Sequence, residues 1–227
     1  MKVYTLKLLS PLYYRSRIDS GAAGATVTSP WIGDLALMYA INNSLGLKHI
    51  NFKYAEHAPT YREIIDTGIF LSVATPKNSC VFTKVFDIAT SFMADGYPNT
   101  KAMENSKRAP MRNWNKRQGL EPGNEFIFVA LTKNKGIELP DHFTVRLGNT
   151  KECLAECDYL EDNRTINNVS INAYTLNLIY GHEKLMQILS EISQKGYDTY
   201  IENNSSQYIL IRNFPLAEIR KYLMDYN

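Results

Sequence analysis

Alternating hydrophobic and polar positions open the chain and predict a half-buried β-strand from Lys2 to Leu9. One face of this strand carries Tyr4, Leu6 and Leu8, and the other carries Val3, Thr5 and Lys7. The next pattern predicts a helix from Pro30 to Leu45, with apolar residues on every face, so we expect this helix to be deeply buried. Ser29 before Pro30 is an N-cap and first-turn signal, and Gly46 suits a C-cap.

The remainder of the chain is rich in strand patterns and ends with helical ones. Strands are expected over Gly68 to Ala74, Cys80 to Phe86, Phe126 to Thr132, His142 to Leu147, Glu152 to Leu160, Ser170 to Ile179 and Ser206 to Arg212. Helical spacing from Leu185 to Ile192 predicts a helix that Gly196 stops, and Pro215 opens a terminal helix. This order predicts an α+β protein with a mainly antiparallel sheet, compatible with a ferredoxin-like or RNA-recognition-type sandwich.

One long stretch interrupts these patterns and is predicted to be an insertion. Phe86 to Asn124 lacks a sustained hydrophobic period, and strong strand patterns flank it on both sides. No linker rich in glycine, proline or serine marks a second domain. We therefore expect a single RNA-recognition-like domain over residues 1–227, with an inserted segment over residues 87–124.

Positive charge is concentrated inside this insertion. Residues 101–117 carry six basic side chains and one acid, a net charge of +5, whereas the whole chain carries +2. Cations that neutralise phosphates beside an aromatic face that stacks on a base are typical of nucleic-acid binding. A solvated loop that only aids solubility is the alternative. The candidate RNA-binding residues here are Lys107, Arg108, Arg112, Trp114, Asn115, Lys116 and Arg117.

A second candidate lies between the first strand and the first helix. Gly21 and Gly24 stand in a small-residue loop just before the predicted helix, so backbone N–H groups there can cradle a phosphate. Arg15 and Arg17 lie just upstream and add positive charge. A flexible connector without a ligand is the alternative interpretation.

Composition restricts the remaining possibilities. The three cysteines, Cys80, Cys153 and Cys157, lack paired spacing, which favours buried free thiols over a disulfide framework or a metal site. No apolar run approaches the roughly 18 residues of a membrane span. The first residues are too polar for a signal peptide. We expect a cytoplasmic protein that makes no membrane contact.

No convincing catalytic or metal-binding pattern is present in the sequence. There is no GxxxxGK[ST] phosphate loop or GxGxxG motif, and His182-Glu183 lacks the second histidine of a zinc motif because position 186 is Met. A metal-independent ribonuclease can use a histidine and a tyrosine as acid and base, and Lys53, Tyr54 and His57 are the candidates. We expect no cofactor and no catalytic residues, with that ribonuclease as the alternative.

Several motifs, taken in order, resemble one known family. They are SPLYYRSR from Ser10 to Arg17, IGDLALMYA from Ile32 to Ala40, LEPGNEF from Leu120 to Phe126, and the stretch from Leu139 to Gly148. These resemble the Cas-five family of CRISPR-associated proteins, in the form found in type I-D Cascade. The resemblance covers residues 1 to about 150, and its specificity comes from the order and spacing of short motifs.

The resemblance implies a modified RNA-recognition fold in which the insertion forms a β-hairpin thumb. It implies a subunit of the antiviral Cascade ribonucleoprotein that binds the 5′ handle of the guide RNA (crRNA). It also implies that the subunit caps the backbone of Cas-seven-type subunits, contacts the large subunit, and meets target DNA only indirectly. Arg146, before Gly148, would lie near the handle together with Arg15 and Arg17.

Two other functions stay open at this point. One branch of the Cas-five family processes the guide precursor, so the resemblance does not exclude the metal-independent endoribonuclease. An interaction protein whose basic insertion meets an acidic partner, with no direct RNA contact, is the third hypothesis.

Overall fold

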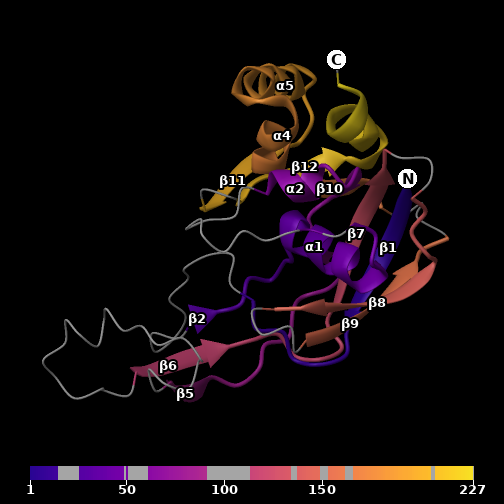
Figure 1. Ribbon diagram of the computed structural model, residues 1–227. Helices are drawn as coiled ribbons and strands as arrows, with labels where there is room; N and C mark the ends of the chain where they lie inside the picture. The colour runs from indigo at the N-terminus through magenta and orange to yellow at the C-terminus, as the bar shows by residue number, and fades with distance from the viewer. Residues whose placement is uncertain are drawn as a thin grey trace, which may run out of the picture.

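A computed structural model describes the arrangement of residues 1–14, 26–48, 50, 61–90, 113–133, 137–148, 153–161, 166–205 and 208–226. It shows a mixed α and β protein with three sheets (Figure 1). Within the described residues, no helix is both long and apolar enough to cross a membrane.

The main sheet is six-stranded, with the spatial order β3-β7-β1-β9-β8 and β4 paired to β7. Every pair in it is antiparallel, as the sequence predicts. The strands are β1 (Lys2–Leu8), β3 (Ile69–Leu71), β4 (Thr75–Pro76), β7 (Glu125–Thr132), β8 (His142–Leu147) and β9 (Cys153–Tyr159). The predicted inward positions of β8 are confirmed, because Phe143, Val145 and Leu147 are buried.

Both faces of the main sheet are covered over part of their area. On one face Tyr4, Leu6 and Leu8 join a core cluster with α1 (Asp34–Leu45). On the other face Val3 and Val129 pack with the C-terminal part of the chain. The prediction of buried free thiols is confirmed for Cys153 and Cys157, whereas Cys80 is only half-buried.

The first helix begins later than predicted. Its N-cap is Gly33 rather than Ser29, since Ile32 is held extended by a two-way backbone pairing with Ala74. Gly33 is also required by packing, because a Cβ there would lie 2.3 Å from the ring of Tyr208. The predicted C-cap is confirmed, with Gly46 in the left-handed region at φ 61°.

The C-terminal part forms a second, three-stranded antiparallel sheet of order β10-β12-β11. Its elements are β10 (Asn168–Asn172), α4 (Ala173–Tyr180), α5 (His182–Gln194), β11 (Tyr200–Ser205) and β12 (Tyr208–Pro215). The strand predicted from Ser170 to Ile179 was wrong beyond Asn172. That side chain caps α4 by accepting a hydrogen bond from the backbone N–H of Tyr174 at 3.1 Å, which ends the strand.

The terminal helix predicted after Pro215 is split into two short pieces. A 3₁₀ turn covers Leu216–Glu218 and a π-helical turn covers Lys221–Asp225. The predicted apolar side is nevertheless buried, with Ile219, Tyr222 and Leu223 packed beneath α5 and β12 in the second core cluster. A short helix, α2 (Arg62–Ile65), completes the described helices.

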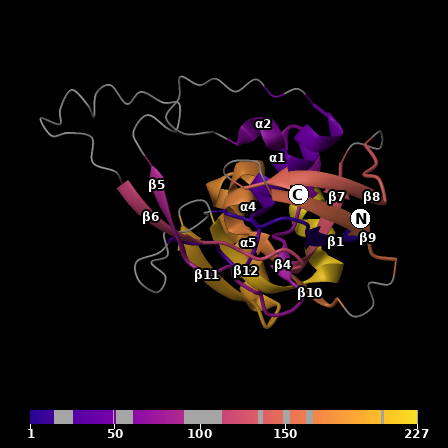
Figure 2. The ribbon, with the colours of Figure 1, turned by 90° about the horizontal axis from the view of Figure 1, so that it is seen from below.

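A third sheet forms where the insertion was predicted. The strands β5 (Phe86–Thr90) and β6 (Asn113–Gln118) pair antiparallel, and β2 (Thr26–Val27) pairs parallel to β6. The strand expected from Cys80 to Phe86 was wrong up to residue 85, where the ladder is limited to an isolated bridge from Phe82 to Leu120, whereas Phe86 begins β5. Figures 1 and 2 show β5 and β6 extending away from the main sheet, at a distance from α5.

Candidate nucleic-acid interface

At the base of the β5–β6 pair, the residues that flank the first predicted RNA-binding segment pair with the described end of the second. Thr26 lies opposite Arg117 in the parallel β2–β6 pair, and the backbone N–H of Thr28 donates to the carbonyl of Gln118 at 2.9 Å. Leu12 and Leu120 exchange two backbone hydrogen bonds of 3.0 Å each. Both ends of the loop that carries Arg15, Arg17, Gly21 and Gly24 are therefore held against the strand that leaves the basic insertion.

The two ends of this loop are also tied to each other. The backbone N–H of Tyr14 donates to the hydroxyl of Thr28 at 3.2 Å, and Thr28 is buried. Gly119 allows this close approach, because a Cβ there would lie 2.5 Å from the ring of Tyr13 and 2.7 Å from the carbonyl oxygen of Leu12. Sequence reasoning did not single out Gly119, since a lone glycine after a polar strand carries no distinctive pattern.

The structure describes some of the predicted RNA-binding residues and not others. Trp114, Asn115 and Lys116 are described only through the backbone pairing of β6, opposite Ala89, Ile88 and Asp87. Arg117 is half-buried in the same strand, and Arg146 is exposed on β8. The remaining candidates, which are Arg15, Arg17, Gly21, Gly24, Lys107, Arg108 and Arg112, lie outside the described residues.

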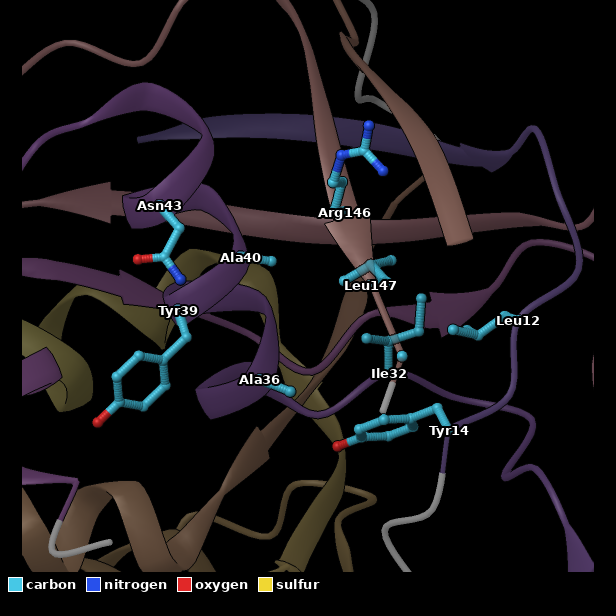
Figure 3. Close-up of a pocket in the computed structure, with 10 residues that line it drawn as sticks. Leu12, Tyr14, Ile32, Ala36, Tyr39, Ala40, Asn43, Arg146 and Leu147 are labelled. Atoms are coloured by element: carbon cyan, nitrogen blue, oxygen red, sulfur yellow. The ribbon is translucent and has the colours of Figure 1, made fainter. Parts of the chain in front are cut away.

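A groove between α1 and the end of β8 reaches the start of the same loop (Figure 3). Its deeper part is a hollow of about 180 Å³. A shallower hollow continues from it along α1 and β8 and shares Ala40, Asn43 and Arg146. The lining residues of the deeper part are Leu12, Tyr14, Ile32, Ala36, Tyr39, Ala40, Asn43, Arg146, Leu147 and Gly148.

Arg146 is the one lining residue of this groove that the sequence already placed near RNA. It stands at the rim, with Leu147 below it in the groove (Figure 3). Tyr39 and Asn43 were missed, because both lie in a helix whose apolar residues occur on every face and therefore looked uniformly buried. Their spacing of four residues, which places them on one helix face, was the available signal.

The wall of the groove formed by Tyr14 is anchored to the C-terminal sheet. The Tyr14 hydroxyl donates to the Tyr208 hydroxyl at 3.0 Å, and the Tyr208 ring lies 5.2 Å from the ring of Trp31, between centroids. Burial raises the pKa of both phenols above the usual range, so each hydroxyl keeps its proton at neutral pH. The position of Tyr14 therefore depends on a contact made far along the chain.

A buried carboxyl fixes the N-terminal end of α1 to the same C-terminal unit. Asp34 has no exposed surface, and its Oδ1 accepts from the Asn172 side-chain amide at 2.9 Å. Its other oxygen, Oδ2, accepts from the Thr175 hydroxyl. Burial raises the pKa of Asp34, although these hydrogen bonds oppose the shift. We interpret this network as structural, since every described partner lies within the protein core.

His142 is an ionisable side chain on the exposed side of β8. His142 contacts Asp158 through Nδ1 at 2.6 Å and Glu156 through Nε2 at 3.7 Å, on the exposed side of β8 and β9. The hydrogen bond to Asp158 raises the pKa of His142. Each ring nitrogen already faces a carboxylate, so an exposed ion cluster explains the arrangement. The ribonuclease candidates Lys53, Tyr54 and His57 lie outside the described residues.

Comparison with known protein families identifies the family of this chain. A family model described as "Type I-D CRISPR-associated protein Cas5/Csc1" matches residues 1–200. The chain belongs to this type I-D Cas5/Csc1 family. The resemblance seen in residues 1 to about 150 is thereby confirmed, and the match extends through α4 and α5 into the C-terminal unit.

Solved structures provide more distant matches to this Cas5/Csc1 chain. One is a chain of the type III-B Cmr-β complex bound to cognate target RNA and AMPPnP, with 11% identity and a TM-score of 0.43. It covers 94% of this chain and 84% of the other. A second chain, from Cmr-β bound to cognate target RNA, has 12% identity, a TM-score of 0.44 and coverages of 94% and 85%. No curated protein gives a significant match.

Proposed function

We propose that this Cas5/Csc1 chain is a non-catalytic subunit of a type I-D Cascade surveillance complex in antiviral defence. In this role it binds the 5′ handle of crRNA and caps the backbone filament. The observation that supports the proposal is the pairing of Leu12 and Thr26 to Thr28, which flank one predicted RNA-binding segment, with Arg117 to Leu120 at the end of the other. Segments far apart in sequence are thus joined at one place, next to a groove whose rim residue Arg146 has no acidic partner among the described residues, as a site that binds a strand requires.

The strand order supports the RNA-recognition-type part of the proposal. With the short β4 and the edge strand β8 left out, the remaining strands of the main sheet follow one another along the chain as β1, β3, β7 and β9, and in space they run β3-β7-β1-β9. That is the order of a ferredoxin-like sheet, with α1 following the first strand. The β5–β6 pair then stands between the second and third strands, as expected for an inserted hairpin thumb.

RNA would be held mainly through its phosphates. Lys107, Arg108, Arg112, Lys116 and Arg117 supply the charge of the thumb, and Arg15 and Arg17 supply that of the neighbouring loop. Single-stranded bases splayed from the backbone can stack on an aromatic side chain, the role we assign to Trp114. Neutralising several phosphates makes binding steeply dependent on salt.

Protein partners would contact the base of the thumb. Leu9, Val81, Phe82 and Val85 are apolar and between 36% and 62% exposed. The segments that carry Leu9 and Val81 are joined through Asn124: its carbonyl accepts from the backbone N–H of Leu8 at 3.0 Å, and its side chain exchanges two hydrogen bonds of 2.8 Å with the backbone of Val81. Exposed apolar side chains on adjoining segments are typical of a protein interface. We assign it to a backbone Cas-seven-type subunit, with the large subunit as the other neighbour and target DNA reached only through the complex.

The proposal is tested by charge reversal within the assembled complex. Changing Lys107, Arg108, Arg112, Lys116 and Arg117 to Glu should abolish retention of crRNA, measured as RNA content per purified complex. The matched control reverses Lys133 and Lys184, which are exposed and lie away from the thumb. Unchanged RNA content in the variant with all five substitutions would contradict the proposal.

A further inference from the structure

We propose that the groove between α1 and β8 holds one unstacked nucleobase of the bound RNA, with the flanking phosphate on Arg146. This inference rests on the proposed RNA-binding function and adds a specific subsite to it. The subsite lies on the body of the protein, at the start of the loop between β1 and β2, and not on the thumb.

The floor of the groove suits a flat apolar ring. Ala36 and Ala40 present small side chains one helical turn apart, and Leu12 and Leu147 close the far side (Figure 3). Gly148 lets the chain at Tyr13 pack closely against the end of β8, since a Cβ there would lie 3.0 Å from the carbonyl oxygen of Tyr13 and φ is 85°. A planar base can therefore approach the helix surface without meeting a long side chain.

The rim of the groove offers polar groups that match a nucleotide. Arg146 is exposed, and no acidic side chain within the described residues pairs with its guanidinium. The amide of Asn43 is exposed as well, and no described residue hydrogen-bonds to it. An amide both donates and accepts, so it can pair with the edge of a base, while a guanidinium binds phosphate in a bidentate manner.

The volume of the groove and the polar groups at its rim favour a nucleotide over other occupants. The deeper hollow of about 180 Å³ is smaller than the roughly 300–1,000 Å³ of typical small-molecule pockets, so it accommodates a single ring system. The adjoining, more open hollow of about 470 Å³ leaves room for the sugar and phosphate of the same nucleotide. An aliphatic side chain from a neighbouring subunit would fill the floor but leave Arg146 and Asn43 without partners. A base with its phosphate satisfies the floor and both rim groups.

The test is an abasic scan of the guide RNA that co-purifies with the complex. The full-length chain is titrated with synthetic copies of this RNA, each lacking one base near the 5′ end. We expect one position at which removal of the base weakens binding roughly 5- to 100-fold, the range for a single stacked base. At that position, Ala36→Leu should weaken binding of intact RNA by a similar factor and leave binding of the abasic RNA unchanged.

Two matched variants separate this result from general damage. Ala217→Leu adds the same side chain at an exposed position of the 3₁₀ turn Leu216–Glu218, outside the groove, and should bind like the native chain. Arg146→Ala should weaken all RNAs of the set alike and lower the salt slope by about 1. The abasic scan of the native chain needs no substitution, so it stands even if Ala36→Leu fails to fold.

Three results would overturn the inference. If removal of each base weakens RNA binding by about the same factor, the RNA-binding function stands but the groove does not hold a base. A loss of subunit binding in Ala36→Leu, with a flat scan, assigns the groove to a protein side chain. Absence of any RNA binding by the native chain and complex would remove the proposed function together with the subsite.

Discussion

Arg117 of β6 lies opposite Thr26 of β2 in a parallel pair, although 90 residues separate them along the chain. This contact joins the end of the loop after β1 to the base of the basic insertion. Elements that bind one RNA strand must be held at a fixed distance from one another, and a backbone pairing provides that constraint without relying on mobile side chains.

Gly119 is predicted to be essential for this arrangement. In Gly119→Ala the new Cβ would press on the Tyr13 ring and on the backbone carbonyl of Leu12, at 2.5 and 2.7 Å. Because a backbone atom cannot turn aside, we expect a loss of about 1–3 kcal/mol in the free energy of unfolding. Urea denaturation measures this, with Glu121→Ala on the nearby surface as the control. Equal stability of both variants would show that the loop is not packed as described.

The hydrogen bond between Tyr14 and Tyr208 is predicted to couple the groove to the C-terminal sheet. Each single change to Phe should cost about 0.5–1.5 kcal/mol of unfolding free energy. The double variant should cost less than the sum of the two, since they share one interaction of 3.0 Å. A double-mutant cycle by thermal or urea unfolding gives the coupling energy. Strictly additive losses would indicate that the two hydroxyls do not interact.

Glu191 is predicted to contribute stability that disappears in acid. Hydrogen bonds from Lys221 and Tyr222 lower its pKa from 4.5 to about 2. A lowered folded-state pKa gives stability that is complete above about 4.5 and lost as pH falls towards about 2. The pair is partly exposed, so Glu191→Gln should cost about 0.2–1 kcal/mol at pH 7.

The pH dependence of that difference is the decisive measurement. Urea unfolding of the native chain and Glu191→Gln at pH 7, 5 and 3 should show the two stabilities converging between pH 5 and 3. A difference that stays constant over this range would mean that the carboxylate is not stabilised by its charged partner.

The non-catalytic assignment is predicted to hold for the purified chain. Incubation with a repeat-containing RNA in EDTA should leave the RNA bound but uncut. Site-specific cleavage that is lost in His57→Ala would instead establish the metal-independent endoribonuclease.

Local patterns in the sequence were sufficient for the strands of the main sheet except β4 (Thr75–Pro76), which was predicted as part of a turn. Alternation predicted β8 over its full length, from His142 to Leu147, and predicted β1 to within one residue. Sequence signals for the start of a helix were less reliable. Ser29 and Pro30 look like a helix start, but long-range pairing of Ile32 with Ala74 keeps the chain extended for another turn.

The candidate site was harder to predict because its parts are distant in sequence. Charge density identified the insertion, and the family resemblance identified Arg146. The groove between α1 and β8 could not be predicted, since Tyr39 and Asn43 acquire their position only when β8 packs beside the helix. After Ser170 the chain changes from strand to helix at Asn172, whose side chain caps the helix. The surrounding apolar residues made this cap hard to recognise in the sequence.

Photochemical crosslinking within the assembled complex tests the central claim most directly. After ultraviolet irradiation, peptides of this chain that carry RNA are identified by mass spectrometry, and the crosslinked nucleotides are mapped by sequencing. We expect crosslinks from the segments around Tyr14, the β5–β6 pair and Arg146 to the 5′ handle of crRNA. Crosslinks confined to the spacer or the 3′ end, or none from this chain, would contradict it.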